Sequence, residues 1–233
     1  MDEPRILICV KSCRRDQYNG YNDNVRQTWL RDLKGANYCF VLGNGATRLH
    51  PDELILNCGD SYRDLPEKTH ALCKWFVNQE YDHFFACDTD SFIIPNKLLG
   101  DTKYRECDYL GFFNGEIGRP FEIYGSLWAW ASGGSGYFVS RRAAQIVSEV
   151  NPDAYSMCPE TKIPSEDLML GQILGPYIQR GELTAKHDDR FGRSWRGDYK
   201  VDVTAHFQAD SAGRAIPSDW MRRHYEANRT GCS

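Results

Sequence analysis

A short apolar segment that ends in two carboxylates places the strongest limit on how this chain folds. Residues 84–87 are apolar and rich in aromatic side chains, and the run is too short for a helix, so it predicts a buried strand. Asp88 and Asp90 follow at once, with apolar residues 92–94 behind them. Side chains at positions i and i+2 of extended chain point the same way, so we expect both carboxylates to project together from the carboxyl end of this strand.

The Asp88/Asp90 pair has two interpretations. Like charges held this close repel each other unless a cation lies between them, and Mn²⁺ or Mg²⁺ binds carboxylates while completing its shell with phosphate oxygens and water. Alternatively, the pair belongs to a solvated turn, because Asp and Ser favour turns. The turn is the commoner outcome for an isolated Asp-x-Asp, so the metal interpretation depends on the rest of the chain.

The order of elements in the first half predicts an α/β fold. Apolar runs indicate strands, and capping residues before amphipathic stretches indicate helices. The expected strands are residues 5–10, 38–42 and 54–56, and the expected helices are residues 25–33, capped by Asn24, and 64–79. Because strands and helices alternate, we expect a mainly parallel, doubly wound, Rossmann-like sheet with the strand at 5–10 in its interior.

The second half is less regular and carries the expected acceptor side. We expect strands at 108–113 and 137–140, helices at 141–150, 165–174 and 218–228, and loops at 116–130 and 151–164. No repeat or linker divides the sequence. We therefore expect one domain, residues 1–233, with a nucleotide-type half at about 1–95 and an acceptor-type half at about 96–233.

Composition argues against several classes of protein. The net charge is −4 and no block of Lys and Arg occurs, which argues against a nucleic-acid-binding face. No apolar run is long enough to span a bilayer, so we expect a cytoplasmic protein if the chain is complete and a Golgi-type lumenal one if it is a truncated piece. The nine cysteines include no Cys-x-x-Cys pair, which favours reduced thiols over a zinc site.

Two acids at an expected helix start are candidates for catalysis. If Ser165 caps this helix, Glu166 and Asp167 lie in its first turn, where the dipole and the N–H groups favour the ionised form. Either carboxylate then suits a general base that takes a proton from a hydroxyl. Acids are also common at helix starts for structural reasons alone. Gly171 within the helix predicts close packing of backbone or ligand.

Three further features suit a sugar-binding cleft. Glycines in residues 132–136 precede a strand rather than a helix, so they predict close approach to a ligand and not a phosphate loop. The aromatic residues Tyr124, Trp128 and Trp130 belong either to the core or to a stacking platform for a sugar. A third metal ligand is expected from His206, which ends a strand-like run, or otherwise from His187.

Taken together, these segments resemble the β-1,3-glycosyltransferase family of β-1,3-galactosyltransferases and Fringe. Five segments match the family's motifs in order: Val-Arg-Gln-Thr-Trp at 25–29, Asp-x-Tyr-x-x-Leu-x-x-Lys-Thr at 60–69 with Trp75, Asp-Thr-Asp at 88–90, Ser-Gly-Tyr-Phe-Val-Ser at 135–140, and Glu-Asp with Gly171 at 166–171. Thr89 departs from the family's Asp-Asp-Asp motif. The resemblance extends over residues 25–171 and not beyond.

The resemblance implies a GT-A fold and a metal-dependent, inverting transfer of a hexose of galactose or N-acetylglucosamine type from a UDP-sugar to a glycan or glycoprotein acceptor. The residues that we expect at the nucleotide are Val10, Lys11, Ser12, Arg26, Lys68, Asp88, Thr89 and Asp90. Those for Mn²⁺ (or Mg²⁺) are Asp88, Asp90 and His206. Asp167, with Glu166 as its substitute, is the expected base, and the sugar residues are Gly134, Ser135, Gly136, Trp128 and Trp130. A retaining, glycogenin-like transferase and a non-catalytic nucleotide-sugar binding module are the alternatives.

Overall fold

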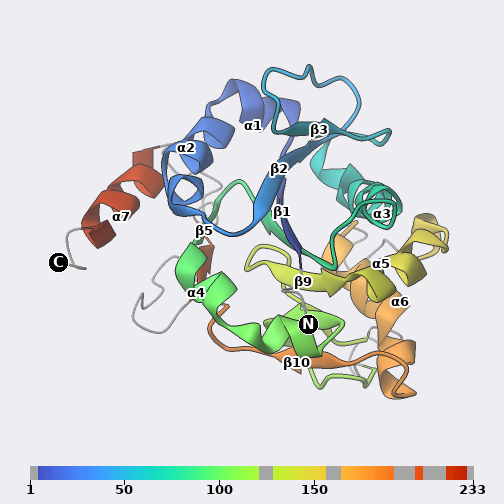
Figure 1. Cartoon of the computed structure of the whole chain (residues 1–233). Helices are drawn as coiled ribbons and strands as arrows, with labels where there is room; N and C mark the ends of the chain where they lie inside the picture. The colour runs from blue at the N-terminus through green and yellow to red at the C-terminus, as the bar shows by residue number, and fades with distance from the viewer. Residues whose placement is uncertain (1–4, 121–127, 156–163, 192–202, 207–218, 230–233) are drawn as a thin grey trace.

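A seven-stranded sheet forms the centre of the molecule (Figure 1). The computed structural model describes residues 5–120, 128–155, 164–191, 203–206 and 219–229. The strand order is β10-β6-β9-β4-β1-β2-β3. The bounds are β1 Ile6–Lys11, β2 Asn37–Leu42, β3 Glu53–Ile55, β4 His83–Asp88, β6 Tyr109–Gly111, β9 Tyr137–Ser140 and β10 Ala185–His187.

The sheet is mainly parallel, as the alternation of elements predicts. β1 pairs in parallel with β2 and β4, β2 with β3, and β10 with β6. β9 is antiparallel to both of its neighbours, β4 and β6. β1 lies between β2 and β4, so its interior position is confirmed. Because β1 and β4 are parallel and in register, Lys11 and Asp88 lie side by side at the carboxyl edge of the sheet.

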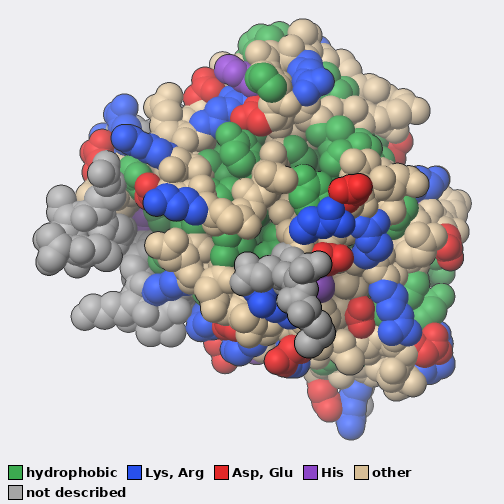
Figure 2. All heavy atoms as spheres, viewed as in Figure 1, with side chains coloured by type: hydrophobic (Ala, Val, Ile, Leu, Met, Phe, Trp, Pro, Cys, Tyr) green, Lys and Arg blue, Asp and Glu red, His purple; other side chains and the backbone are tan. Residues whose placement is uncertain are grey.

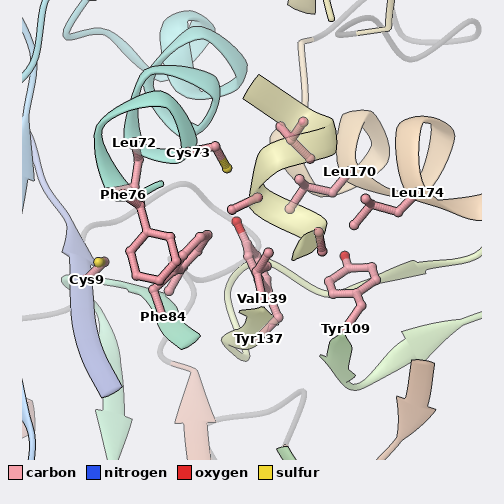
Figure 3. Packing of buried hydrophobic residues seen from close by; sticks show 14 of the residues in the cluster. Cys9, Leu72, Cys73, Phe76, Phe84, Tyr109, Tyr137, Val139, Leu170 and Leu174 are labelled. Carbon is pink, nitrogen blue, oxygen red and sulfur yellow. The ribbon is translucent and has the colours of Figure 1, made fainter. Parts of the chain in front are cut away.

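Helices cover both faces of the sheet, and the alternation of side chains along β1 shows why. Ile8 and Val10 face one apolar cluster and Leu7 and Cys9 face the other. The cluster around Cys9 is covered by α3 (Leu65–Phe76), α5 (Arg141–Ser148) and α6 (Glu166–Gln179), as Figure 3 shows. The cluster around Ile8 is covered by α2 (Tyr21–Gln27), α4 (Pro95–Gly100) and α7 (Asp219–Arg229).

Short elements complete the described chain. Two further two-stranded sheets pair β11 with β5 and β7 with β8. The bounds of the remaining elements are α1 Arg14–Tyr18, η1 Trp29–Asp32, η2 Tyr62–Asp64, β5 Ser91–Ile93, η3 Thr102–Glu106, β7 Phe113–Asn114, β8 Trp130–Ala131, η5 Pro152–Ala154 and β11 Thr204–His206. The expected strand at 108–113 is therefore two strands, β6 and β7, which pair in different sheets.

Two helices differ most from their expected bounds, whereas the others differ by at most three residues at either end. The helix expected at 25–33 begins four residues earlier, after Gly20, whose φ of 78° turns the chain out of α1. It ends at Gln27 and continues as the 3₁₀ turn η1, so Asn24 lies inside the helix and is not its cap. The helix expected to end at 174 runs on to Gln179. Gly175 lies within this extension, and a Cβ there would lie only 2.6 Å from the Trp128 Cβ atom.

Gly171 confirms the expected close packing, and segment 128–130 is what approaches it. A Cβ at Gly171 would lie 2.8 Å from the Trp130 Cβ atom and 3.0 Å from the Ala129 carbonyl oxygen. The two glycines of α6 therefore let segment 128–130 lie directly on the helix. This packing fixes α6 against β8, whose strand leads towards the glycines at 132–136.

Three features of the described chain concern its cysteines, its surface charge and the character of its helices. The seven cysteines of the described chain are free thiols. Basic and acidic side chains are interspersed over the face shown in Figure 2. In the part of the chain that the structure describes, no helix combines the length and the apolar character that crossing a membrane requires.

Candidate active site

The two acids that follow β4 lie at a tight turn. β4 ends at Asp88, residues 89–90 form the turn, and β5 begins at Ser91. The Asp88 N–H donates to the Ser91 Oγ atom at 3.1 Å, which closes the turn. The chain is therefore not extended from Asp88 to Asp90, and the expectation that both side chains share a direction for that reason is wrong. Thr89 is buried, and its hydroxyl donates to the Asp16 Oδ2 atom at 2.9 Å.

Lys11 connects this strand tip to the helix that carries the other two acids. Its ammonium lies 3.2 Å from the Asp88 Oδ1 atom and also contacts the Glu166 Oε1 atom. The Lys11 side chain is only 1% exposed, against 31% for Asp88 and 8% for Glu166. Burial opposes the charge on Lys11, but the two carboxylates outweigh it and hold the pKa of Lys11 above its usual value.

The glycine-rich turn at 132–136 lies between these groups. The Gly133 N–H donates to the Asp167 Oδ2 atom at 3.2 Å, and the Gly134 carbonyl accepts from the Ser91 hydroxyl at 2.8 Å. The Ser135 carbonyl accepts from the hydroxyl of Thr204 on β11. A Cβ at Gly133 would overlap the Glu166 carboxylate. The turn therefore joins the end of β4, the start of α6 and β11, and glycine at 133 leaves the space that the carboxylate needs.

The Asp167 carboxyl group has a raised pKa although several donors surround it. Ser165 is at the N-cap position, and its hydroxyl donates to the Asp167 Oδ1 atom, which also accepts the Leu168 N–H at 2.8 Å. Burial and the neighbouring charge of Glu166 nevertheless raise the pKa of Asp167 above its ordinary value. The expected preference for the ionised form at the helix start is therefore outweighed.

The loop after β1 is held by buried polar contacts beside this cluster. The Lys68 ammonium donates to the Ser12 carbonyl and, at 2.9 Å, to the Asp60 Oδ1 atom. Asp60 also accepts the Gly43 N–H at 2.7 Å and the Arg14 N–H at 2.6 Å. Asp60 thus links the segments that follow β1 and β2 to α3. Sequence reasoning assigns no role to this residue, although it opens the matching segment at 60–69.

Other residues expected at the nucleotide have different surroundings. The Ser12 hydroxyl donates to the Asn22 Oδ1 atom at 2.6 Å, and Val10 is fully buried in the apolar cluster around Ile8. The Arg26 guanidinium binds Asp52 through two hydrogen bonds of 2.9 and 2.8 Å.

The same guanidinium also contacts Asp23 and Glu53 and lies 4.5 Å from the centre of the Phe40 ring. Its contacts in the described structure therefore connect α2 with β2 and β3. Its expected contact with the nucleotide stays a prediction.

The two candidate histidines lie in different places. His206 ends β11, as expected, and its backbone pairs with Ser91, next to Asp90. His187 lies on β10, three strands away from β4 in the sheet order. Its Nδ1 atom accepts the Phe113 N–H at 3.0 Å, and its Nε2 atom lies 2.8 Å from the Asp189 carboxylate. Backbone position thus favours His206. No group of three His, Cys, Asp or Glu suited to a metal occurs among the side chains that the structure describes.

The aromatic residues divide into packed and exposed ones. Trp128 and Trp130 are half-buried and pack on the two glycines of α6, while Tyr124 lies outside the described residues. Tyr62, by contrast, is 73% exposed. It lies in η2, where the Ser61 and Asp64 side chains form a capping box, two residues after Asp60.

Comparison with solved structures relates this architecture to glycosyltransferases. The chain is similar to a glycosyltransferase involved in the glycosylation of the major capsid of PBCV-1, with a TM-score of 0.55, 14% identity and coverage of 96% of this chain and 100% of that one. It is also similar to the galactosyltransferase LgtC in complex with donor and acceptor sugar analogues, with a TM-score of 0.53, 10% identity and coverage of 96% and 95%.

An active-site mutant of LgtC gives a similar match, with a TM-score of 0.52 and 10% identity over 96% of this chain and 95% of that one. No protein-family model matches the sequence, and a search of curated proteins gives no match either. The chain therefore has the GT-A type of fold found in these glycosyltransferases, with a mainly parallel central sheet flanked by helices.

Proposed function

We propose that this chain is a glycosyltransferase that moves a hexose from a UDP-sugar to a hydroxyl of a glycan or glycoprotein. The observation that carries the proposal is the junction at the glycine turn. In a glycosyltransferase fold, this turn holds the acids at the start of α6 beside the tip of β4. Asp88 and Asp90 at the carboxyl edge of the parallel sheet suit a donor site, and Asp167 at the start of α6 suits an acceptor site that faces it.

The charge at this junction supports a requirement for a divalent cation. The Lys11 ammonium contacts the carboxylates of Asp88 and Glu166, and Asp167 adds a third carboxylate beside them. Asp90 lies two residues after Asp88. A diphosphate carries negative charge of its own and would be repelled here without added positive charge. The oxygen donors suit a hard cation such as Mn²⁺ or Mg²⁺, so the residues fit the group.

We assign Asp88 and Asp90, with His206, to hold this cation. The backbone pairing of His206 with Ser91 supports its inclusion. When bound, the cation supplies positive charge that stabilises the departing diphosphate. Segment 10–12, Lys68 and Thr89 then lie on the nucleotide side, where the hydrogen bonds of Lys68 to Ser12 and Asp60 support a fixed loop.

Asp167 is assigned as the general base. Its raised pKa makes the Asp167 carboxylate a stronger base towards an acceptor hydroxyl. The hydroxyl oxygen then attacks the anomeric carbon from the side opposite the diphosphate, and the configuration inverts. This is the chemistry that the resemblance to β-1,3-galactosyltransferases and Fringe implies. Gly134, Ser135, Gly136, Trp128 and Trp130 border the sugars in this proposal, and exposed Tyr62 offers an additional ring surface.

The test is turnover of defined donors. We expect hydrolysis of at least one of UDP-galactose, UDP-N-acetylglucosamine, UDP-glucose and UDP-xylose, dependent on Mn²⁺ and abolished by EDTA. With an accepted sugar acceptor, NMR of the product should show an inverted anomeric centre. Retention would contradict Asp167 as a simple base and favour the glycogenin-like alternative. Binding of UDP with no turnover of any donor would favour the non-catalytic binding module.

A further inference from the structure

Lys11 makes a contact pattern that the nucleotide assignment does not explain. Its ammonium is buried at the end of β1 and touches Asp88 on one side and Glu166 on the other. These two partners come from different elements, β4 and α6, and Glu166 is 155 residues away in the sequence. The ammonium also lies 5.4 Å from the centre of the Tyr137 ring, on β9. One buried cation at the end of β1 therefore contacts three other elements, β4, α6 and β9.

The two neighbouring acids of α6 have different surroundings. Glu166 is almost fully buried, its carboxylate contacts Lys11, and Gly133 lies against it without a side chain. Asp167 is partly exposed and is held by the Gly133 N–H, the Leu168 N–H and the Ser165 hydroxyl. A buried carboxylate paired with an ammonium is fixed in place, whereas one held by neutral donors can exchange a proton.

We infer that Lys11 is a positioning residue that fixes Glu166 as its counter-ion and so leaves Asp167 as the single base of the site. The inference rests on the proposed function and deepens it by separating the roles of the two acids. Lys11 acts through geometry, because it ties α6 to the tip of β4. It also acts through charge, because it offsets the negative charge of Glu166 beside Asp167. In this scheme Lys11 acts on the reaction through Glu166 and Asp167 and is not itself a base.

The effect on Asp167 has a definite sign. The charged and titratable groups around it are Glu166, Lys11 and Tyr109, with Tyr62 nearby. The negative charge of Glu166 raises the pKa of Asp167, and the positive charge of Lys11 lowers it. Removing the ammonium should therefore move the titration of Asp167 to higher pH. Removing the charge of Glu166 should move it to lower pH.

The experiment is a double-mutant cycle with Lys11→Met, Glu166→Gln and the variant that combines both. Thermal unfolding of the full chain is the first readout. Because an unpaired buried carboxylate is costly, Lys11→Met should lower Tm by about 10 °C. The combined variant should recover at least half of that loss, since the carboxamide introduced at position 166 needs no counter-ion. Additive losses of Tm would overturn the pairing.

The second readout is the titration of Asp167, followed by NMR of protein labelled at the Asp carboxyl carbon. The signal of Asp167 is identified by its loss in Asp167→Asn. Glu166→Gln should shift the titration to lower pH and Lys11→Met to higher pH, with the combined variant between them. An unmoved titration would overturn the inference. If Lys11→Met does not fold, Glu166→Gln alone decides it.

The third readout separates this inference from the proposed function. In the wild-type protein, the acid limb of Mn²⁺-dependent donor turnover should follow the Asp167 titration, and it should shift in Glu166→Gln in the same direction as the NMR signal. If the wild-type protein turns over none of the donors, the proposed function is contradicted. The Tm cycle and the NMR titration then still decide whether Lys11 pairs with Glu166 and shifts Asp167. An active wild-type protein with additive Tm losses contradicts the inference alone.

Discussion

Two of the buried charge clusters in the described chain each contain a carboxyl group with a shifted pKa, and the two shifts have opposite directions. One cluster surrounds Arg26 and joins α2 to β2 and β3, and the other surrounds Lys11 at the carboxyl edge of the sheet. In the first, burial alone would raise the pKa of Glu53, but hydrogen bonds from Leu49, Arg26 and His50 outweigh it and lower the pKa. In the second, burial and Glu166 raise the pKa of Asp167.

Under the proposed function, the difference separates a structural cluster from a reactive one. The planar Arg26 guanidinium donates two hydrogen bonds to the Asp52 carboxylate and one to Glu53, so these carboxylates are held by charged donors. Lys11 presents a point charge to two acids, and a third acid beside them is left with neutral donors. Perturbed carboxylates in a cleft are candidates for chemistry, whereas satisfied ones hold the fold together.

The largest expected effect concerns the acid with the raised pKa. Asp167→Asn should lower the rate of sugar transfer by about 10² to 10⁴, because the carboxamide cannot take the hydroxyl proton. Affinity for UDP with Mn²⁺, measured by calorimetry, should change little. A loss of UDP binding together with transfer would mean that Asp167 is structural and would remove the contrast between the two clusters.

The matching change in the other cluster is Arg26→Met. It leaves Glu53 and Asp52 without their ionic partner, so the free energy of unfolding should fall by about 3–5 kcal/mol in urea titrations. Transfer per folded molecule at low temperature should be nearly unchanged. A rise in KM for the UDP-sugar would place Arg26 at the nucleotide instead, because loss of folded protein lowers Vmax and leaves KM unchanged.

The deficit of positive charge in the Lys11 cluster predicts a metal effect at Asp90. Asp90→Ala should weaken UDP binding by about tenfold or more in Mn²⁺ and change it little in EDTA. Calorimetry of both proteins in both buffers provides the measurement. Equal affinity of the wild-type protein for UDP in the two buffers would contradict the metal role. In that case Lys11 would be the principal positive charge near the diphosphate.

The space at Gly133 provides a smaller test. In Gly133→Ala the new methyl group would overlap the Glu166 carboxylate and push it away from Lys11, so transfer should fall severalfold while the free energy of unfolding falls by about 1–3 kcal/mol. Gly100→Ala is a matched control, because a Cβ there meets nothing within 4 Å. Equal behaviour of the two variants would show that the position of Glu166 is unconstrained.

The smallest effect is the dependence of stability on pH, and it has opposite signs in the two clusters. The lowered pKa of Glu53 gives stability that is present above its unfolded value of 4.5 and is lost as pH falls through the folded pKa. The raised pKa of Asp167 gives stability that is present below 3.8 and is lost as pH rises through the folded pKa.

Stability curves against pH should therefore diverge for two conservative variants. Asp167→Asn should gain stability relative to wild type as pH rises from about 4 to 7, by about 1.4 kcal/mol for each pH unit that separates the folded pKa from the unfolded one. Glu53→Gln should lose stability relative to wild type over the same rise. Parallel curves for the two variants would mean that the clusters do not differ in the way described.

Local pattern is sufficient to predict much of the fold. The apolar runs at 5–10, 38–42 and 84–87 correspond to β1, β2 and β4, and the cap and helix expected at 165 correspond to α6. Helix ends are less predictable, because Gly175 ends a helix in an isolated pattern but here packs on Trp128. The strand expected at 108–113 divides because its residues pair with two different partners.

The candidate site is predictable in its residue types and less so in its contacts. Motifs identify the acids at 88, 90, 166 and 167, and β11 brings His206 beside the turn as its pattern suggests. The pairing of Lys11 with Glu166 spans 155 residues and depends on how the strands and α6 pack, so no local sequence pattern predicts it. The partners of Arg26 are Glu53 on β3 and Asp52 just before it, and the motif at 25–29 does not predict these contacts.

The hydrogen bonds around Asp60 have a consequence for how quickly a donor binds. Lys68, Gly43 and Arg14 hold the segments after β1 and β2 in one arrangement through a single carboxylate. The conformational entropy of these segments is therefore lost when the protein folds and not when the donor binds. Stopped-flow mixing with UDP should accordingly show one concentration-dependent phase without a slow isomerisation, so that the encounter itself sets the rate.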